Sequence, residues 1–247
     1  MKRDASSARE SRDRLIALQR ILVTILLLVT GQAYGEMALH HYSFDSTTVV
    51  DSVGTANGTL IGGATVNSGM LTLDGVDDSV QFGQQIIPTT GDFSVMFLAR
   101  ELSPSSWYAE IISQGRTGGA GFYVGYGPTH NVRIGDSWMN TGIAFPSDGL
   151  FHHYAVTRSD TDTRFYIDRS LVAINPWPIQ MSGFGDVTRL GRQFSPYGEY
   201  FHGNIDELWV FRGALTPDQI VVPLPGAVLL GALGLSVAGW RLKREVG

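Results

Sequence analysis

Hydrophobic and polar residues alternate along much of the chain between residues 39 and 220, and no segment there has a helical period. We interpret the clearest alternating segments as β-strands: residues 92–100, 120–126, 150–158, 163–168 and 204–211. Turn pairs such as Asp148-Gly149 separate these segments. One short helix is expected after them, with Thr216 as its N-cap and Pro217 at its first position. Strands at this spacing without intervening helices predict an all-β fold, a two-sheet antiparallel sandwich.

The N-terminus has the parts of a secretion signal in their usual order. Residues 1–20 are polar and rich in arginine, residues 21–30 are apolar, and Ala33 and Gly35 are small residues where a signal peptidase reads the chain. The apolar run is shorter than the roughly 20 residues that span a membrane. We therefore predict a signal peptide over residues 1–35, with a signal helix that is cleaved after Gly35. An uncleaved signal anchor is the alternative, and N-terminal sequencing distinguishes the two.

The C-terminus, residues 221–247, combines an apolar stretch of about one membrane span with a basic cluster at 241–244. A short proline motif opens it: Val222, Pro223, Leu224 and Pro225. These features resemble the PEP-CTERM sorting signal of exopolysaccharide-producing Gram-negative bacteria, although Leu224 replaces the commoner Glu. The resemblance implies a transmembrane helix that an exosortase-type protease removes, as in the processing of a GPI signal. A permanent single-pass anchor is the alternative.

Composition narrows the classes of protein that remain. The 247 residues include no cysteine, which excludes disulfides, thiolate metal sites and a cysteine nucleophile. The net charge is −5 and the basic residues concentrate at the two ends, so the middle is more acidic than the whole chain. A nucleic-acid partner would need a basic stripe and is not expected. Roughly 180 residues remain between the two end signals, enough for one domain with its own core.

Four segments of the middle carry a family resemblance: residues 41–45 (HYSFD), 71–80 (LTLDGVDDSV), 148–158 (DGLFHHYAVTR) and 203–211 (GNIDELWVF). In this order they resemble motifs of the concanavalin A-like lectin/glucanase superfamily, in its laminin G-like branch. The resemblance implies that residues 36–220 form a jelly-roll sandwich. The chain departs from the pattern at Phe151, where the family usually has Trp, and at Arg169, where a hairpin usually has the Gly that a tight primed turn favours.

The superfamily contains glucanases, so glycoside hydrolysis by the acidic residues must be considered. That reaction uses two carboxylates about 5–9 Å apart, which the family's glucanases carry on one strand as E-x-D-x-x-E. The nearest segment, residues 204–208, has Asn204 and Leu208 at the outer positions, and Glu110 has no Asp partner nearby in sequence. We therefore predict no enzymatic activity and no catalytic residue. Turnover of β-glucans that disappears in an Asp206→Ala protein would contradict this prediction.

Calcium is the cofactor that the resemblance implies, as a structural ion bound by carboxylate and carbonyl oxygens. The candidate ligands lie in the matching motifs: Asp45, Asp77, Asp78 and Asp206. The alternative is that these residues form turns or bind a neighbouring loop. Transition-metal binding is not expected, because adjacent histidines such as His152 and His153 face opposite sides of a strand.

Aromatic residues in turn-rich segments are the candidate sugar-binding groups, because a flat ring offers a stacking surface. They are Trp107, Tyr108, Trp138, Trp177, Tyr197 and Tyr200. Trp177 is the strongest candidate for an exposed ring, since Pro176 and Pro178 stiffen its loop. The alternative for each residue is packing between a loop and the sheet.

Two function classes follow. The first is an exported binding module, without catalysis, for a glycan or glycoconjugate of the cell surface or extracellular matrix. The second is a structural or adhesive protein of the exopolysaccharide matrix with no small ligand, and a glycoside hydrolase comes third. The expected partners are a matrix polysaccharide, signal peptidase, an exosortase-type enzyme and, before processing, the inner membrane. The choice between a binding and a structural protein rests on analogy of fold.

Overall fold

The computed structural model describes residues 37–115, 120–135, 137–181, 185–194 and 198–220. The chain divides into two compact units, Met1–Ala38 and Leu39–Gly247, and nearly all of the described residues belong to the second. The predicted signal peptide and the predicted C-terminal sorting signal lie outside the described residues, as does Tyr197. Within the described ranges, no helix is long and apolar enough to span a membrane.

The described part of the second unit consists of strands and one short 3₁₀ helix. In chain order these are β1 (Ala38–Tyr42), β2 (Gly58–Ile61), β3 (Thr65–Asn67), β4 (Met70–Asp74), β5 (Ser79–Phe82), β6 (Phe93–Glu101), β7 (Ala109–Gly115), β8 (Gly121–Tyr126), β9 (Val132–Ile134), β10 (His152–Arg158), β11 (Thr163–Ile167), β12 (Ser170–Asn175), β13 (Asp186–Leu190), β14 (His202–Arg212) and η1 (Pro217–Gln219). Each of the five strands expected from alternation is present, and the jelly-roll sandwich is confirmed.

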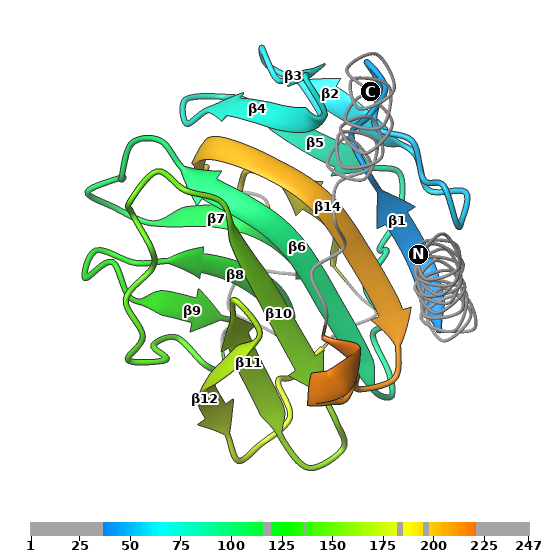
Figure 1. Cartoon of the computed structure of the whole chain (residues 1–247), viewed down its shortest axis with the longest axis vertical. Coiled ribbons are helices and arrows are strands. Elements are labelled where there is room, and N and C mark those ends of the chain that lie inside the picture. The colour runs from blue at the N-terminus through cyan, green and yellow to red at the C-terminus, as the bar shows by residue number, and fades with distance from the viewer. Residues whose placement is uncertain (1–36, 116–119, 136, 182–184, 195–197, 221–247) are drawn as a thin grey trace, which may run out of the picture. The chain divides into compact units, whose positions relative to one another are not determined.

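The strands form two antiparallel sheets (Figure 1). The sheet that we call sheet A has the order β12-β11-β10-β6-β14-β4-β3, with β1 also paired to β14. The other, sheet B, has the order β2-β5-β13-β7-β8-β9. Consecutive strands pair in β10-β11-β12, β7-β8-β9 and β3-β4, whereas other neighbours come from more distant parts of the chain, as where β6 lies between β10 and β14. This exchange of strands between two layers is typical of jelly rolls.

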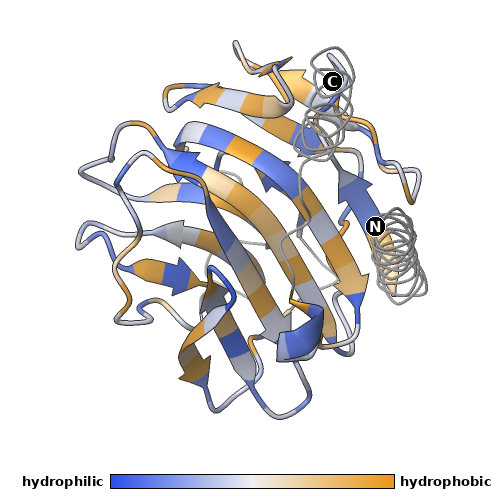
Figure 2. Ribbon diagram, viewed as in Figure 1, coloured by the Kyte–Doolittle hydropathy of each residue, from blue (hydrophilic) through white to orange (hydrophobic). Residues whose placement is uncertain are grey.

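Alternating side chains of the two sheets build one core between them. On β6, Phe93, Val95, Phe97 and Ala99 belong to the core cluster, and each is at most 1% exposed. The residues between them face the other side of sheet A, because successive side chains of a strand point to opposite faces. Figure 2 shows β6 as hydrophobic over most of its length and β14 as a succession of hydrophobic and hydrophilic bands. Burial of each large apolar side chain contributes about 1.5–3 kcal/mol.

The predicted short helix is present as η1. Pro217 occupies its first turn, and the Thr216 N–H donates a 2.9 Å hydrogen bond to Oε1 of Gln219. The strand β14 ends just before it, and the segment is tied to β6 because Oγ of Ser94 accepts the N–H of Leu215 and donates to the carbonyl of Gly213. The prediction of Thr216 as the N-cap is confirmed.

The hairpin between β11 and β12 makes a tight primed turn without glycine. Ile167 pairs with Ser170, which leaves Asp168 and Arg169 as a two-residue loop with φ of 49° and 69°. Positive φ at both positions is what a type I′ turn requires. Asp168 also accepts a 3.0 Å hydrogen bond from the N–H of His153, which supports its conformation. The departure from the family's Gly at Arg169 therefore leaves the turn geometry intact at some cost in strain.

Replacing Arg169 with glycine should raise the free energy of unfolding by about 0.5–1 kcal/mol, because Gly adopts positive φ without the strain of a Cβ atom. Urea denaturation measures the change. Gly149→Ala is the matched control, since Gly149 has φ of 75° and a Cβ atom there would meet no described atom within 4 Å. That substitution should lower stability by a similar amount, and a destabilised Arg169→Gly protein would contradict the expectation.

Candidate functional site

The predicted aromatic residues differ in how much of their surface they offer to a ligand. Trp107 and Trp177 are 63% and 72% exposed. Trp138 is partly buried and packs against the core, so packing is the better description of its ring. Tyr200 is partly buried, with the guanidinium of Arg192 5.2 Å from its ring centre. Of the predicted rings that the structure describes, only Trp107 and Trp177 are largely exposed.

Trp107 stands next to a group of charged residues on the outer face of sheet B. Phe122 and Val124 of β8 belong to the core, so the alternate residues Tyr123 and Gly125 face away from it. Gly125 pairs with Glu110 of β7 on one side and with Arg133 of β9 on the other. The side chains of Glu110 and Arg133 therefore lie in one row across three strands.

Gly125 provides the space in which the two charged side chains meet. A Cβ atom at this position would lie 2.1 Å from the carbonyl oxygen of Ala109 and 2.2 Å from Oε2 of Glu110. Both distances are far inside van der Waals contact, and one of them is to backbone. The absence of a side chain on the middle strand thus allows Glu110 and Arg133 to form an ion pair over it.

Arg133 connects two carboxylates from distant parts of the chain. Its Nη2 donates to Oε1 of Glu110 and to Oε2 of Glu199, which lies on the loop between β13 and β14. Gln193, on the same loop, donates from Nε2 to Oε2 of Glu199 at 3.2 Å. The N–H of Glu110 also donates to the carbonyl of Glu199 at 2.9 Å. These bonds attach the β13–β14 loop to the outer face of sheet B.

Two tyrosines enclose the guanidinium of Arg133. Its carbon atom lies 4.2 Å from the ring centre of Tyr108 and 4.7 Å from that of Tyr123. Each cation–π contact contributes about 0.5–2 kcal/mol, more where water is excluded. Trp107 packs edge-on against Tyr108, with 5.1 Å between the ring centres. The exposed Trp107 ring is therefore linked to the sheet through Tyr108 and Arg133. We call Trp107, Tyr108, Arg133, Glu110 and Glu199 the Trp107 site.

Burial shapes the electrostatics of this site. The side chain of Glu110 is 0% exposed, that of Arg133 4% and that of Glu199 12%. Burial raises the pKa of Glu110 well above its usual value, although Arg133 opposes the shift. Burial lowers the pKa of Arg133, but the two carboxylates raise it more, so the guanidinium stays charged. A buried charge is stable only with such partners.

Some hydrogen-bonding capacity of the site is unused. The buried atoms Arg133 Nε, Glu110 Oε2 and Gln193 Oε1 have no hydrogen-bond partner among the described residues. Buried polar atoms are usually satisfied by protein, water or ligand. A buried water molecule is the partner that such atoms commonly have. The carboxylates of Glu110 and Glu199 face one guanidinium, and Glu110 is fully buried. This arrangement holds the two side chains in position and does not expose an acid and a base together.

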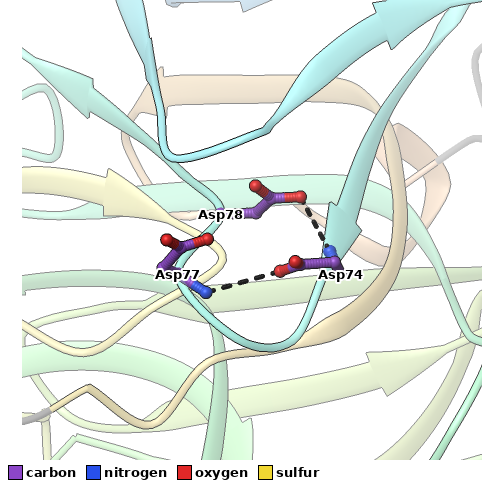
Figure 3. A group of neighbouring side chains, drawn as sticks. All are labelled: Asp74, Asp77 and Asp78. Carbon is purple, nitrogen blue, oxygen red and sulfur yellow. Dashed lines mark hydrogen bonds between the residues drawn. The ribbon is translucent and has the colours of Figure 1, made fainter.

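Acidic residues gather elsewhere, in the turn between β4 and β5. Oxygen atoms of Asp74, Asp77 and Asp78 lie within 4.8 Å of one another, and such a group could hold a metal ion (Figure 3). Parts of it already have structural partners. Oδ2 of Asp78 accepts the N–H of Asp74 at 2.9 Å, and Oδ1 of Asp74 accepts the N–H of Val76 at 2.8 Å. The turn interpretation of these residues thus has direct support.

The four predicted calcium ligands fall into two groups. Asp77 and Asp78 join Asp74, which the sequence analysis did not select. Asp45 is not in this group, and its charge acts on Asp206: burial, then Glu207 and Asp45, raise the pKa of Asp206 to about 7. Asp74 pairs with His202, four residues before Asp206 on β14, which is a separation of about 13 Å along a strand. One ion cannot be bound by all four residues.

Three of the four histidines in the two adjacent pairs contact carboxylates, and the ring of the fourth, His153, has no hydrogen-bond partner among the described residues. His152 lies between Asp168, at 2.7 Å, and Asp148, at 3.1 Å. His153 is 2% exposed and is a packing residue. His40 contacts Asp51 at 2.6 Å and His41 contacts Glu207 at 2.9 Å. His40 and His41 bind different carboxylates, and His153 is buried while His152 contacts Asp148 and Asp168, so neither pair is arranged to share one ion.

Comparison with protein families identifies the larger group. The family model of the concanavalin A-like lectin/glucanases superfamily matches residues 74–221. The chain belongs to this superfamily. The match includes β5 to β14 and thus both Glu110 and Arg133, and it begins within the second of the four segments on which the resemblance was based, residues 71–80. Comparison with curated proteins finds no match.

Solved structures of the superfamily's fold include sugar-binding and sugar-cleaving proteins. Domain 4 of AbnA, an extracellular arabinanase from Geobacillus stearothermophilus in complex with arabinotriose, has 21% identity and a TM-score of 0.61, covering 74% of this chain and 95% of that domain. Trypanosoma rangeli sialidase has 11% identity and a TM-score of 0.59, over 74% of this chain and 32% of its own.

Botulinum neurotoxin type C, whose cell entry depends on two ganglioside molecules, has 14% identity and a TM-score of 0.59. The match covers 76% of this chain and 51% of the toxin structure, so this chain spans about half of it and about a third of the sialidase. At these identities the comparisons establish the fold. The fold carries both enzymes and binding domains, so a function must be argued from the site.

Only some residues of the Trp107 site could be selected from the sequence. Trp107 and Tyr108 were among the candidates, but Glu110, Arg133 and Glu199 were not expected to meet. A local signal exists, because Glu110 and Arg133 are single charges within apolar strands and a buried charge needs a partner. Glu199 is 66 residues from Arg133 in sequence, and only the fold brings it there.

Proposed function

We propose that this chain is an exported, non-catalytic glycan-binding protein, with the Trp107 site as its binding surface. The observation that supports the proposal is a tryptophan ring, 63% exposed, that packs on Tyr108 over the charged group of Arg133. Exposed aromatic rings at fixed positions stack on the apolar faces of sugars, and nearby polar groups bind the hydroxyls. The sugar complexes of proteins with the same fold agree with this assignment.

We propose that the Trp107 site binds a glycan without hydrolysing it. Glu110 and Glu199 form a pair of carboxylates, but Arg133 lies between them and Glu110 is fully buried. Hydrolysis needs a carboxylic acid and a second carboxylate on either side of a bound glycosidic bond, with access to it. On sheet A, Asp206 and Glu207 follow each other at an irregularity in β14, and Glu207 binds His41. Neither arrangement supports an acid and a base flanking a sugar.

Export, removal of residues 1–35 and sorting through residues 221–247 are part of the proposal and rest on the sequence alone. They place the sandwich at the cell surface or in the extracellular matrix. A polysaccharide there is the proposed partner, and the structural or adhesive role without a small ligand is the competing function. The mature ends of the secreted protein, read by mass spectrometry, test this part separately from glycan binding.

Trp107→Ala should weaken binding to the best ligand of a glycan array by at least tenfold, about 1.4 kcal/mol of binding free energy. The loss follows from removal of the stacking surface, and isothermal titration measures it. Trp177→Ala is the matched control, because Trp177 is as exposed but lies on the loop after β12 of sheet A. Loss of binding in Trp177→Ala alone would move the site to sheet A. A protein with no array ligand whose deletion abolishes cell aggregation would favour the structural function.

We further propose calcium as a structural cofactor of one of the two acidic groups. Calcium prefers carboxylate oxygens, which both groups offer. Calcium should then raise the melting temperature relative to a chelator. Asp77→Asn should abolish the difference if the β4–β5 turn binds the ion, and Asp45→Asn should abolish it if the group near Asp206 does. Equal melting temperatures with calcium and chelator would exclude this cofactor.

A further inference from the structure

The charge of the sandwich restricts the kind of glycan that the Trp107 site can bind. Between residues 37 and 220 the sequence has 18 acidic residues and 9 basic ones, a formal charge of −9. All nine basic residues are arginines, and lysine is absent from this range. A polyanion approaching a protein of this charge is repelled over the whole surface unless a local cationic patch attracts it.

Several of the described arginines already have partners that occupy their donors. Arg164 pairs with Asp162 at 2.9 Å, and Arg189 pairs with Asp186 at 3.2 Å. Arg158 donates to the carbonyl oxygens of Gly91 and Ile179. Arg133, the cation of the Trp107 site, binds two carboxylates and is 4% exposed. The positive charge at the site is therefore internal and neutralised.

The accessible charged group of the site is a hydrogen-bond acceptor, connected to the Trp107 ring through Arg133 and Tyr108. Glu199 is the most exposed of the three charged side chains, and Gln193 next to it has an Oε1 atom without a partner among the described residues. Oε1 of Gln193 is buried, so the carboxylate of Glu199 is the acceptor to which a sugar hydroxyl can donate, and a hydrogen bond to a charged acceptor is stronger than one to a neutral acceptor. The carboxylate of a uronic or sialic acid would instead face the carboxylate of Glu199.

We propose that the ligand is an uncharged glycan, stacked on Trp107 with a hydroxyl group donating to Glu199, and that the site rejects anionic polysaccharides. This inference rests on the proposed function and adds the chemical class of the ligand. It distinguishes this chain from proteins of the same fold that bind sialic acid, because like charges face each other at the point where such an acid would enter.

The test compares neutral and anionic glycans on the full-length protein in a calcium buffer and, in parallel, in a chelating buffer, in which no divalent cation bridges like charges. The panel contains arabinan, β-1,3-glucan and fully methyl-esterified polygalacturonan as neutral polymers, and alginate and polygalacturonate as anionic ones. The two polygalacturonans share a backbone and differ in charge. At least one neutral polymer should bind ten times more tightly than either anionic one, at low as well as moderate salt.

The outcomes separate the inference from the function on which it rests. An anionic polymer that binds as tightly as the best neutral one overturns the inference and leaves glycan binding in place. Failure of all five polymers to bind, followed by an array without hits, overturns the proposed function and the inference with it. Either result is visible with the wild-type protein alone.

A Glu199→Gln variant gives a second test of the discrimination between neutral and anionic glycans. It removes the charge but keeps an acceptor for Arg133, so the loop should stay in place. We expect binding of the neutral glycan to weaken several-fold and the discrimination against the anionic polymer to shrink. Glu207→Gln is the control, because it makes the same charge change on sheet A, where Glu207 binds His41. Unchanged discrimination in Glu199→Gln, with a melting temperature like wild type, would contradict the role of Glu199.

Discussion

Arg133→Met is expected to lower the free energy of unfolding by about 3–5 kcal/mol, because it leaves Glu110 buried without the cation that compensates its charge. Glu110 is 0% exposed and cannot regain water without movement of the β13–β14 loop. The substitution also removes the contacts of the guanidinium with Tyr108 and Tyr123. Methionine fills much of the lost volume, so a cavity contributes little. Denaturation in urea at pH 7.5 measures the change.

The pH dependence of this loss identifies its cause. Burial raises the pKa of Glu110, and without Arg133 the pKa should rise further. A carboxyl group whose pKa is raised in the folded state stabilises it below the unfolded pKa and loses that contribution as pH rises. The Arg133→Met protein should therefore be closest to wild type near pH 5 and furthest from it near pH 8.

A double variant provides the control. Glu110→Gln removes the charge that Arg133→Met leaves unpaired, so the double variant should be more stable at pH 7.5 than Arg133→Met alone. The difference between the double and the sum of the singles gives the coupling energy. An Arg133→Met protein that loses less than about 1 kcal/mol, with no dependence on pH, would show that the pair contributes no more than a surface ion pair.

The fold could be predicted from the sequence because its signal is local and repeated. The segments of β6 and β14 combine apolar and alternating residues behind turn residues, and this signal is visible without the structure, although both strands are buried along nearly their whole length. The short edge strands β2, β3 and β9 have three or four residues each, too few for a clear period. The strand β7 is buried along its whole length and does not alternate, so periodicity did not reveal it.

The candidate site was less predictable, because it depends on contacts between distant segments. Exposure of Trp177 agreed with its stiff proline-flanked loop, whereas Trp138 proved to pack against the core. The ion pairs of Arg133 join three segments, and their meeting requires the pairing of β7, β8 and β9 and the space above Gly125. No spacing within the sequence encodes that space. The four predicted calcium ligands failed to form one group for the same reason.

His153→Leu is expected to reduce the loss of stability between pH 6.5 and pH 4. The wild-type side chain is 2% exposed and neither ring nitrogen has a hydrogen-bond partner among the described residues. Burial lowers its pKa to about 4. Over this range the unfolded chain binds a proton at His153 that the folded protein does not bind, so stability falls as pH falls. One pKa unit corresponds to about 1.4 kcal/mol, so the total is about 3 kcal/mol.

The measurement is the difference between the stability curves of the two proteins from pH 8 to pH 4. The difference is needed because Asp206, with a pKa raised to about 7, contributes the opposite slope to both curves. Leucine and histidine are similar in size, and His153 lies opposite Leu98 of β6, so an apolar side chain suits the position. At pH 8 the two proteins should differ by less than about 1.5 kcal/mol.

The neighbouring histidine gives a control of opposite sign. Burial opposes protonation of His152, but Asp168 and Asp148 raise its pKa above the usual value. Its contribution is fully present below the unfolded pKa and is lost as pH rises through the folded pKa. His152→Gln should therefore cost stability at pH 5 and little at pH 8, whereas His153→Leu gains at pH 5. Parallel curves for wild type and His153→Leu would mean that His153 takes up its proton in the folded state and that burial does not control its pKa.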